Sequence, residues 1–183
     1  KTRKQVEVLH SPINDIKEML FEIKDFNENL YICCLLTYGC LLRPHQEIRL
    51  LKWKDFCDDL SHINLTGSKV KSKRNRIVPI PYYVREVLIK RDSNYNVFSN
   101  SIEPYSKGYF SLLWRCFKRL NPGVGASVTI YSFRHTGAIE IFKRTGSITK
   151  LQKAMGHSSI NVSLTYLRGL QVGELKEEDM PVI

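Results

Sequence analysis

The sequence predicts an α+β domain that is mostly helical and carries a small antiparallel β-sheet or hairpin at one edge. Apolar residues recur at helical spacing along most of the 183 residues. One segment, residues 64–81, instead has strand-like ends around a polar and basic turn. The composition, with 43% hydrophobic and 25% charged residues, is that of a globular protein and excludes disordered or low-complexity chains.

The length suits a single domain with its own core. We expect residues 1–10 to be the remnant of a linker and residues 11–183 to form one domain. The chain begins at Lys1, without Met, which favours a piece cut from a longer protein. No apolar run approaches the roughly 18 residues that a membrane span needs, and no secretory signal is evident, so we expect no membrane partner.

Three helices are expected in the first third of the chain. The first begins at Ser11, which can cap it, and Pro12, which fits the first helical position. The second covers 27–38, with an asparagine as its cap and a glycine after its end. The third covers 40–51 and has a proline in its first turn.

A short strand and turn are expected at 53–65, and 64–81 is typical of a β-hairpin with its turn at 72–75. The rest of the chain returns to helical spacing. Further helices are predicted at about 82–91, 106–120, 131–144, 147–155, 159–166 and 170–178.

Positive charge is concentrated in the middle of the chain. The formal net charge is +10, and residues 61–169 alone hold 18 basic and 4 acidic side chains, whereas both ends are slightly acidic. A basic block of this size in a folded domain favours a polyanionic partner, first of all DNA or RNA. The alternative is a solvated basic face that only aids solubility.

The five cysteines indicate no metal site. Their number is odd and they contain no C-x-x-C pair, whereas zinc would need Cys and His at ligand spacing. We expect reduced, buried thiols.

Two short motifs carry candidate chemistry. In "YSFRHTG", Tyr131 and Arg134 lie three residues apart and share one helical face, and a charge among apolar neighbours needs a partner or a substrate. In "LQKAMGHSS", Gly156 is suited to the left-handed residue that ends a helix, which would fix His157 at the turn. Tyr166 follows nine residues later. Taken alone, His157 and Tyr166 are more often structural than catalytic.

The order and spacing of three segments change that interpretation. "LLRPHQEIRLLKW", "YSFRHTGAIEIF" and "LQKAMGHSSINVSLTYL" follow one another in a pattern that resembles the catalytic domain of tyrosine recombinases, the phage-type integrases. That family has an Arg with Glu four positions on, here Arg43 and Glu47. It also has a lysine on a β-hairpin, an H-x-x-R-H motif, a Leu-Gly-His turn and a nucleophilic tyrosine. The resemblance covers roughly 27–170 and implies the fold of that catalytic domain.

The resemblance implies a site-specific recombinase or integrase that cleaves and rejoins DNA through a 3′-phosphotyrosyl intermediate. Arg43 and Arg134 would clamp the scissile phosphate, for which planar guanidinium groups are suited. Tyr166 would attack phosphorus. His157 would hydrogen-bond the phosphate or help to move protons. Lys71 would be the general acid for the leaving 5′-oxygen.

The choice of lysine stays open among three on one face of the hairpin. Lys69, Lys71 and Lys73 alternate along the strand. The family lysine usually lies eight residues before a proline, and counting back from Pro79 reaches Lys71. The others would contact backbone phosphates as DNA-binding residues. That DNA-binding set is Lys69, Lys73, Arg74 and Arg76.

Tyr131 departs from the family pattern, which mostly has His at that position. A phenol titrates near 10, so it is a poor general base at neutral pH, but it can still donate a hydrogen bond and orient the phosphate. Glu47 and His135 are expected to support Arg43 and the helix, or to be plain structure.

The resemblance also implies the partners and the alternatives. We expect double-stranded DNA, a homo-oligomer on DNA (a tetrameric synapse), possible accessory DNA-bending proteins, no metal, ATP or other cofactor, and a cytoplasmic, nucleoid-associated location in a bacterium, phage or mobile element. The acidic tail, 170–183, would dock on a neighbouring protomer or fray. The alternatives are an inactive DNA-binding regulator of recombinase descent and a type IB topoisomerase.

Overall fold

The computed structural model describes residues 10–67, 75–168 and 170. Within these ranges it has seven α-helices and a two-stranded antiparallel sheet, which confirms the predicted fold class. The elements are α1 (Ile16–Phe26), α2 (Glu28–Gly39), 3-10 helices η1 (Ile48–Leu50) and η2 (Trp53–Asp55), β1 (His62–Leu65), β2 (Arg76–Pro79), α3 (Tyr82–Arg85), α4 (Tyr109–Leu120), α5 (Ile130–Thr145), α6 (Ile148–Met155), α7 (Ile160–Leu164) and η3 (Thr165–Leu167). None of the described helices is long and apolar enough to cross a membrane.

The first helix begins later than the sequence predicts. Asp15, and not Ser11, caps α1, because its carboxylate accepts the N–H of Glu18 at 2.9 Å. The Ser11 hydroxyl instead donates to the hydroxyl of Ser127 at 2.8 Å. Serine and aspartate can both cap a helix, and the contact of Ser11 with Ser127, 116 positions along the chain, decides between them. The predicted cap of α2 is confirmed, since the Asn27 side chain accepts the N–H of Leu30.

The helix predicted over 40–51 is wrong. After α2 the chain turns at Leu41, whose φ of 52° lies in the left-handed region. Helical hydrogen bonds return only at Arg43, whose carbonyl accepts the N–H groups of Glu47 and Ile48, and this turn leads into η1. The N–H of Arg43 donates to the carboxylate of Glu47 at 2.8 Å, so a side chain replaces the helical acceptor. This turn directs Arg43 out of the α2 axis.

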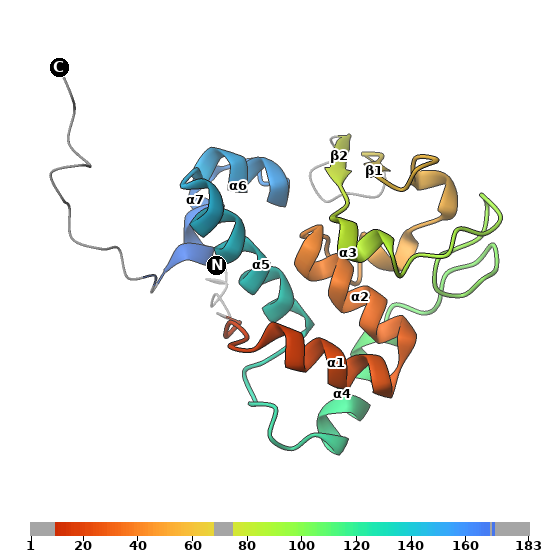
Figure 1. Cartoon of the computed structure of the whole chain (residues 1–183), viewed down its shortest axis with the longest axis horizontal. Coiled ribbons are helices and arrows are strands. Elements are labelled where there is room, and N and C mark those ends of the chain that lie inside the picture. The colour runs from red at the N-terminus through yellow and green to blue at the C-terminus, as the bar shows by residue number, and fades with distance from the viewer. Residues whose placement is uncertain (1–9, 68–74, 169, 171–183) are drawn as a thin grey trace, which may run out of the picture.

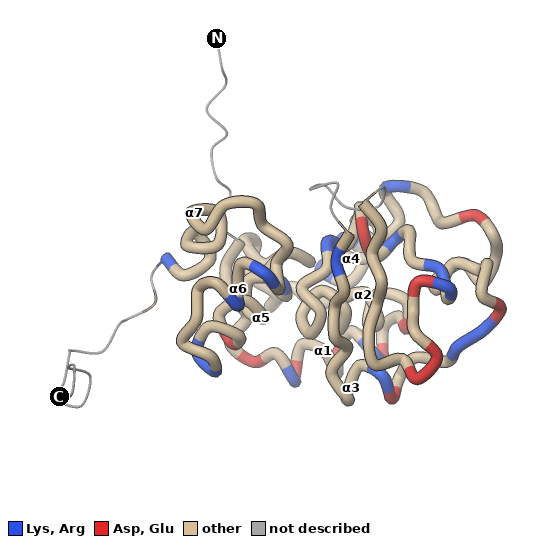
Figure 2. The backbone as a smooth tube through the Cα atoms, turned by 90° about the horizontal axis from the view of Figure 1, so that it is seen from above, with Lys and Arg blue, Asp and Glu red and all other residues tan. Residues whose placement is uncertain are grey.

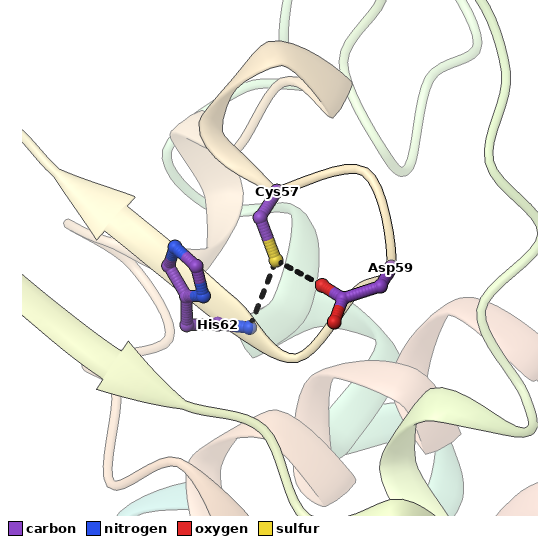
Figure 3. A group of neighbouring side chains, drawn as sticks. All are labelled: Cys57, Asp59 and His62. Atoms are coloured by element: carbon purple, nitrogen blue, oxygen red, sulfur yellow. Dashed lines mark hydrogen bonds between the residues drawn. The ribbon is translucent and has the colours of Figure 1, made fainter.

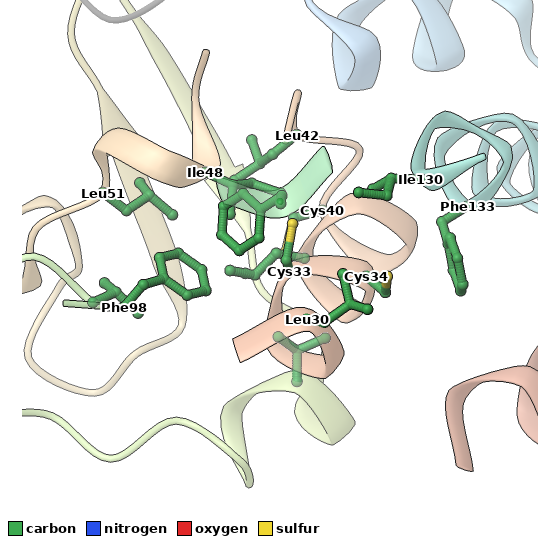
Figure 4. Packing of buried hydrophobic residues seen from close by; sticks show 14 of the residues in the cluster. Leu30, Cys33, Cys34, Cys40, Leu42, Ile48, Leu51, Phe98, Ile130 and Phe133 are labelled. Carbon is green, nitrogen blue, oxygen red and sulfur yellow. The ribbon is translucent and has the colours of Figure 1, made fainter. Parts of the chain in front are cut away.

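The core is built around α2, which is apolar on all sides and buried along most of its length. Figure 1 shows α5, α6 and α7 on one side of α2, and β1, β2 and α3 on the other. Figure 4 shows Cys33 and Cys34 of α2 packed between Phe98 and Phe133. All five cysteines are free, and Cys33, Cys34 and Cys40 are buried as expected.

A close crossing of α2 and α5 sets the geometry of the site. A Cβ atom at Gly137 of α5 would clash with the backbone carbonyl of Tyr38 in α2. The absence of a side chain therefore allows the two backbones to approach. The same crossing puts Arg134, one turn earlier on α5, within reach of the chain that leaves α2 at Leu41.

The predicted hairpin is present as β1 and β2, with His62 opposite Pro79 and Leu65 opposite Arg76. Its turn, with Lys69, Lys71, Lys73 and Arg74, lies outside the described residues, as does all of the tail after residue 170.

Several predicted helices differ in their ends. The helix at 82–91 shortens to α3, and 106–120 begins at Tyr109 in α4. The helix at 159–166 divides into α7 and η3. After α3, a long connection is held by the buried Asn96, whose side-chain amide donates to the carbonyls of Arg49 and Leu51.

Candidate active site

Four segments that are distant in sequence bring the predicted site residues together. Arg43 comes from the turn after α2, Arg134 from the first turns of α5, His157 from the turn between α6 and α7, and Tyr166 from η3. A cleft of about 820 Å³ lies beside them, lined by β2 and by the α6–α7 turn. The cleft walls carry Arg76, Lys150, Lys153 and His157.

Arg134 is buried, with 2% of its surface exposed, and every nitrogen of its guanidinium has a partner. Nε donates to the carbonyl of Leu41 and Nη2 to that of Met155, both at 2.8 Å. Nη1 donates to the hydroxyl of Tyr166 at 3.3 Å. Burial, and next the charge of Arg43, lower the pKa of Arg134 to about 10, so it stays charged at neutral pH.

Arg43 is held by a carboxylate rather than by carbonyls. Its Nη1 donates to Glu47 Oε1 at 2.8 Å, and Glu47 is fully buried. A second guanidinium, that of Arg76 on β2, binds the other oxygen of Glu47 at 3.1 Å. One carboxylate thus faces two guanidinium groups, and with Arg134 nearby the site keeps an excess of positive charge that favours an anion.

His157 sits at the turn that the sequence predicts. Gly156 has a φ of 65° and ends α6, and the Nδ1 of His157 lies 2.9 Å from the hydroxyl of the buried Ser163. The imidazole is tilted against the ring of Tyr166, with centroids 5.6 Å apart. Burial first, and then the charges of three arginines, lower the pKa of His157 to about 3. The ring is therefore neutral at pH 7.

His135 supports the segment that carries Tyr166. Its Nε2 lies 2.8 Å from the backbone carbonyl of Tyr166, and its Nδ1 contacts the carbonyl of His10. The two rings of His135 and Tyr166 meet edge to face. This buried side chain thus joins the start of the described chain to η3.

Tyr131 lies between two histidines that the sequence did not single out. Its ring stacks on His10 at 5.3 Å and lies 6.0 Å from the ring of His45. Burial is the main cause that raises the pKa of Tyr131, so the phenol keeps its proton at neutral pH and acts as a donor. Isolated histidines carry no local signal, and only the fold gathers them here.

Arg76 was predicted as one of the DNA-binding residues. Its side chain is 12% exposed and lies against Glu47 and the α6–α7 turn. Of the hairpin residues predicted for this site, it is the one within the described part of the chain. The predicted roles of all site residues stay predictions.

One group of described residues has atoms close enough to share a metal ion, and Figure 3 shows it in the turn before β1. The Cys57 thiol donates to Asp59 at 2.8 Å, and the hydroxyl of Ser61 lies 3.1 Å from Nδ1 of His62. The hydrogen bond that the Asp59 carboxylate accepts from the Cys57 thiol, and next those from Ser61, lower the pKa of Asp59. These hydrogen bonds explain why the three side chains lie close together without a metal ion. That the reaction needs no metal stays a prediction.

Charge is distributed unevenly over the molecule. Figure 2 shows acidic and basic residues intermixed over the part with the long loops, whereas most charged residues of α5, α6 and the following segments are basic. Residues 130–168 hold six basic side chains and one acidic side chain. The positive side is the one that carries Arg134, His157 and Tyr166.

The model of the phage integrase family matches residues 12–171. Among solved structures, XerA recombinase is similar at 20% identity and a TM-score of 0.66, over 93% of this chain and 61% of that one. A lambda integrase dimer bound to a COC′ core site is similar at 18% identity and a TM-score of 0.68, over 92% of this chain and 51% of that one. The Tn1549 transposon integrase in complex with circular intermediate DNA is similar at 18% identity and a TM-score of 0.65, over 93% of this chain and 65% of that one.

At these identities the likeness shows the shared fold. The chain spans about half to two thirds of the length of these structures. Among curated protein sequences, none matches.

Proposed function

The chain belongs to the phage integrase family, and from this premise we propose that it carries the catalytic site of a site-specific DNA recombinase. One observation supports this most directly. The hydroxyl of Tyr166 lies 3.3 Å from Nη1 of Arg134, so a nucleophile stands beside a buried cation suited to phosphate. Arg43 comes from another segment, the turn after α2, and its charge acts on Arg134.

In the proposed reaction the two arginines hold the non-bridging oxygens of one phosphodiester and stabilise the charge that develops in the transition state. The Tyr166 oxygen forms a bond to phosphorus as the bond to the 5′-oxygen breaks. The products are a 3′-phosphotyrosyl link and a 5′-hydroxyl. Attack by a 5′-hydroxyl of another strand then reverses the step and releases Tyr166, so the bond energy is kept without ATP.

Two proton transfers accompany this step. The Tyr166 hydroxyl loses a proton, and the nearest ring that could accept it is that of His157, which is tilted against Tyr166. Burial and three arginines lower the pKa of His157 and so weaken it as a base, and in this proposal the negative charge of a bound phosphate offsets the arginines and raises that pKa. Ser163 beside Nδ1 orients the ring. Tyr131 keeps its proton and serves to donate a hydrogen bond to the phosphate. The 5′-oxygen gains a proton from Lys71, which remains our choice among the hairpin lysines.

We propose double-stranded DNA as the partner, in keeping with the basic side of the molecule. A tetrameric synapse, accessory DNA-bending proteins and docking of the tail 170–183 on a neighbouring protomer belong to the same proposal, as do independence from metal ions and a cytoplasmic, nucleoid-associated location. The described structure addresses the active site of a single protomer.

A nicked duplex that carries the recombination site of the protein's own mobile element tests the proposal, because the nick traps the covalent intermediate. We expect a protein–DNA adduct on a denaturing gel with the unaltered protein, none with Tyr166→Phe, and a normal yield with Tyr95→Phe, which removes a half-exposed phenol elsewhere. An adduct with Tyr166→Phe would refute the assigned nucleophile.

The same assay separates the two alternatives. Specific binding of the duplex without any adduct would support the DNA-binding regulator. Relaxation of supercoiled DNA without strand exchange between two specific duplexes would support topoisomerase-like activity. Strand exchange is the result that we expect.

A further inference from the structure

Arg76 is built into the interior of the site. Its Nη1 donates to the carbonyl of Ala154 at 3.2 Å and its Nη2 to Glu47 at 3.1 Å. Its Nε is buried without a hydrogen-bond partner. A side chain that serves as a surface anchor for backbone phosphate extends into solvent, whereas this one connects β2 with the end of α6 and with the turn after α2.

The contact with Glu47 reaches Arg43. The same Oε2 atom accepts the N–H of Arg43 at 2.8 Å and Nη2 of Arg76 at 3.1 Å, while Oε1 accepts Nη1 of Arg43. Glu47 is fully buried, so its carboxylate depends on these donors for its charge. Loss of Arg76 would leave the carboxylate with Arg43 as its remaining partner among these donors, so we expect the carboxylate and the guanidinium of Arg43 to be held less firmly.

The contact with the α6–α7 turn reaches His157. A Cβ atom at Gly156 would clash with the guanidinium of Arg76, so Arg76 packs directly beneath the residue that ends α6. Gly156 also needs its left-handed φ of 65°. The turn is closed by the N–H of His157, which donates to the carbonyl of Gln152 at 3.1 Å.

We propose that Arg76 is a positioning residue that ties the hairpin strand to both halves of the site, holding Arg43 through Glu47 and His157 through the Gly156 turn. The catalytic consequence rests on the proposed function, whereas the positioning itself does not. A lysine cannot replace it, because a single ammonium on a flexible chain does not span Glu47 and Ala154 in a fixed plane.

The first test uses the protein without DNA. In Arg76→Gln, we expect amide hydrogen exchange at Gly156 and His157 to become about tenfold faster or more, because the support beneath the turn is lost. Arg115→Gln is the matched control, since it removes the same charge from an exposed position on α4 and should leave these amides unchanged. Equal exchange in Arg76→Gln and the unaltered protein would overturn the proposal.

The second test measures covalent adduct formation on the nicked duplex. At saturating DNA, we expect Arg76→Gln to slow adduct formation about 10- to 100-fold, because small displacements of catalytic groups cost this much. Affinity for the duplex should stay within about threefold. Arg76→Lys should bind equally well and remain slow. A phosphate anchor would behave oppositely, with weaker binding, an unchanged saturated rate and rescue by lysine, and that result would refute positioning.

A double-mutant comparison sharpens the assignment. If Arg76 acts on Arg43 through Glu47, the rate of Arg76→Gln with Glu47→Gln should be close to that of the slower single variant. If the fold-loss in rate of the double variant equalled the product of the two single fold-losses, that connection would be wrong. Should the unaltered protein form no adduct at all, the proposed function fails, and hydrogen exchange still decides whether Arg76 positions the turn.

Discussion

Arg134 and Arg43 come to one site from different segments, α5 and the turn after α2, and different partners hold them. Arg134 is fixed by two backbone carbonyls, which are neutral, so its full charge is available to a phosphate. Arg43 is fixed by the buried carboxylate of Glu47, which offsets part of its charge. The α5–α7 side therefore supplies a rigid cation, and the side with the hairpin supplies one whose charge and direction depend on a network that includes Arg76.

The largest expected effect tests the rigid side. Arg134→Ala should slow adduct formation by about 10³-fold, because it removes the buried donor for the transition-state charge. It should also lower the free energy of unfolding by about 2 kcal/mol or more, since the carbonyls of Leu41 and Met155 lose their partner. The rate of adduct formation on the nicked duplex measures the first effect, and urea unfolding measures the second. Arg119→Ala, at an exposed position on α4, is the control. If Arg134→Ala slowed adduct formation but left the free energy of unfolding unchanged, the predicted structural role of Arg134 would be wrong.

Arg43→Ala should separate rate from stability. We expect adduct formation to slow about 10²-fold, while the free energy of unfolding falls by only about 1 kcal/mol, because Glu47 keeps Arg76 as its partner. DNA affinity should be largely spared in both arginine variants. If Arg43→Ala destabilises the domain as much as Arg134→Ala, the two sides of the site do not differ as we describe.

The smallest expected effect is a pH dependence of stability. The pKa of His157 is lowered from 6.5 to about 3 in the folded protein, so between these values the unfolded chain binds a proton that the folded one does not. This contribution is present above about pH 6.5 and is lost as the pH falls toward 3. Burial lowers the pKa values of His10 and His45 in the same direction. Urea unfolding at pH 5 and pH 7.5 should show a smaller loss of stability in His157→Gln, and an equal loss would argue against the lowered pKa.

Short motifs, together with the family resemblance that their order carries, predicted most of the residues that the described candidate site brings together. Arg134, His157 and Tyr166 belong to short segments whose helix starts, turn and spacing are readable from the chain, and the fold brings them together. The first helix start and the 40–51 helix were not predictable in this way. A distant hydroxyl on Ser127 engages Ser11, and a left-handed Leu41 redirects the backbone.

The position of Arg76 depended on contacts that no local pattern encodes. Its spacing in a basic hairpin is typical of a DNA contact, but its partners, Glu47 and Ala154, lie 29 and 78 residues away. The choice of Lys71 among the hairpin lysines stays a prediction, because those residues lie outside the described part of the chain.

The two bonds of His135 have a consequence for the order of folding. They join residues 125 and 31 positions away, at His10 and Tyr166, and contacts that close long loops form late because loop closure costs entropy. We therefore expect the segment that bears Tyr166 to dock late in folding, after the segment at His10 and helix α5 have come together. Under the proposed function, a half-folded or newly made chain would hold Tyr166 away from Arg134, and DNA cleavage would be confined to molecules that have completed their fold.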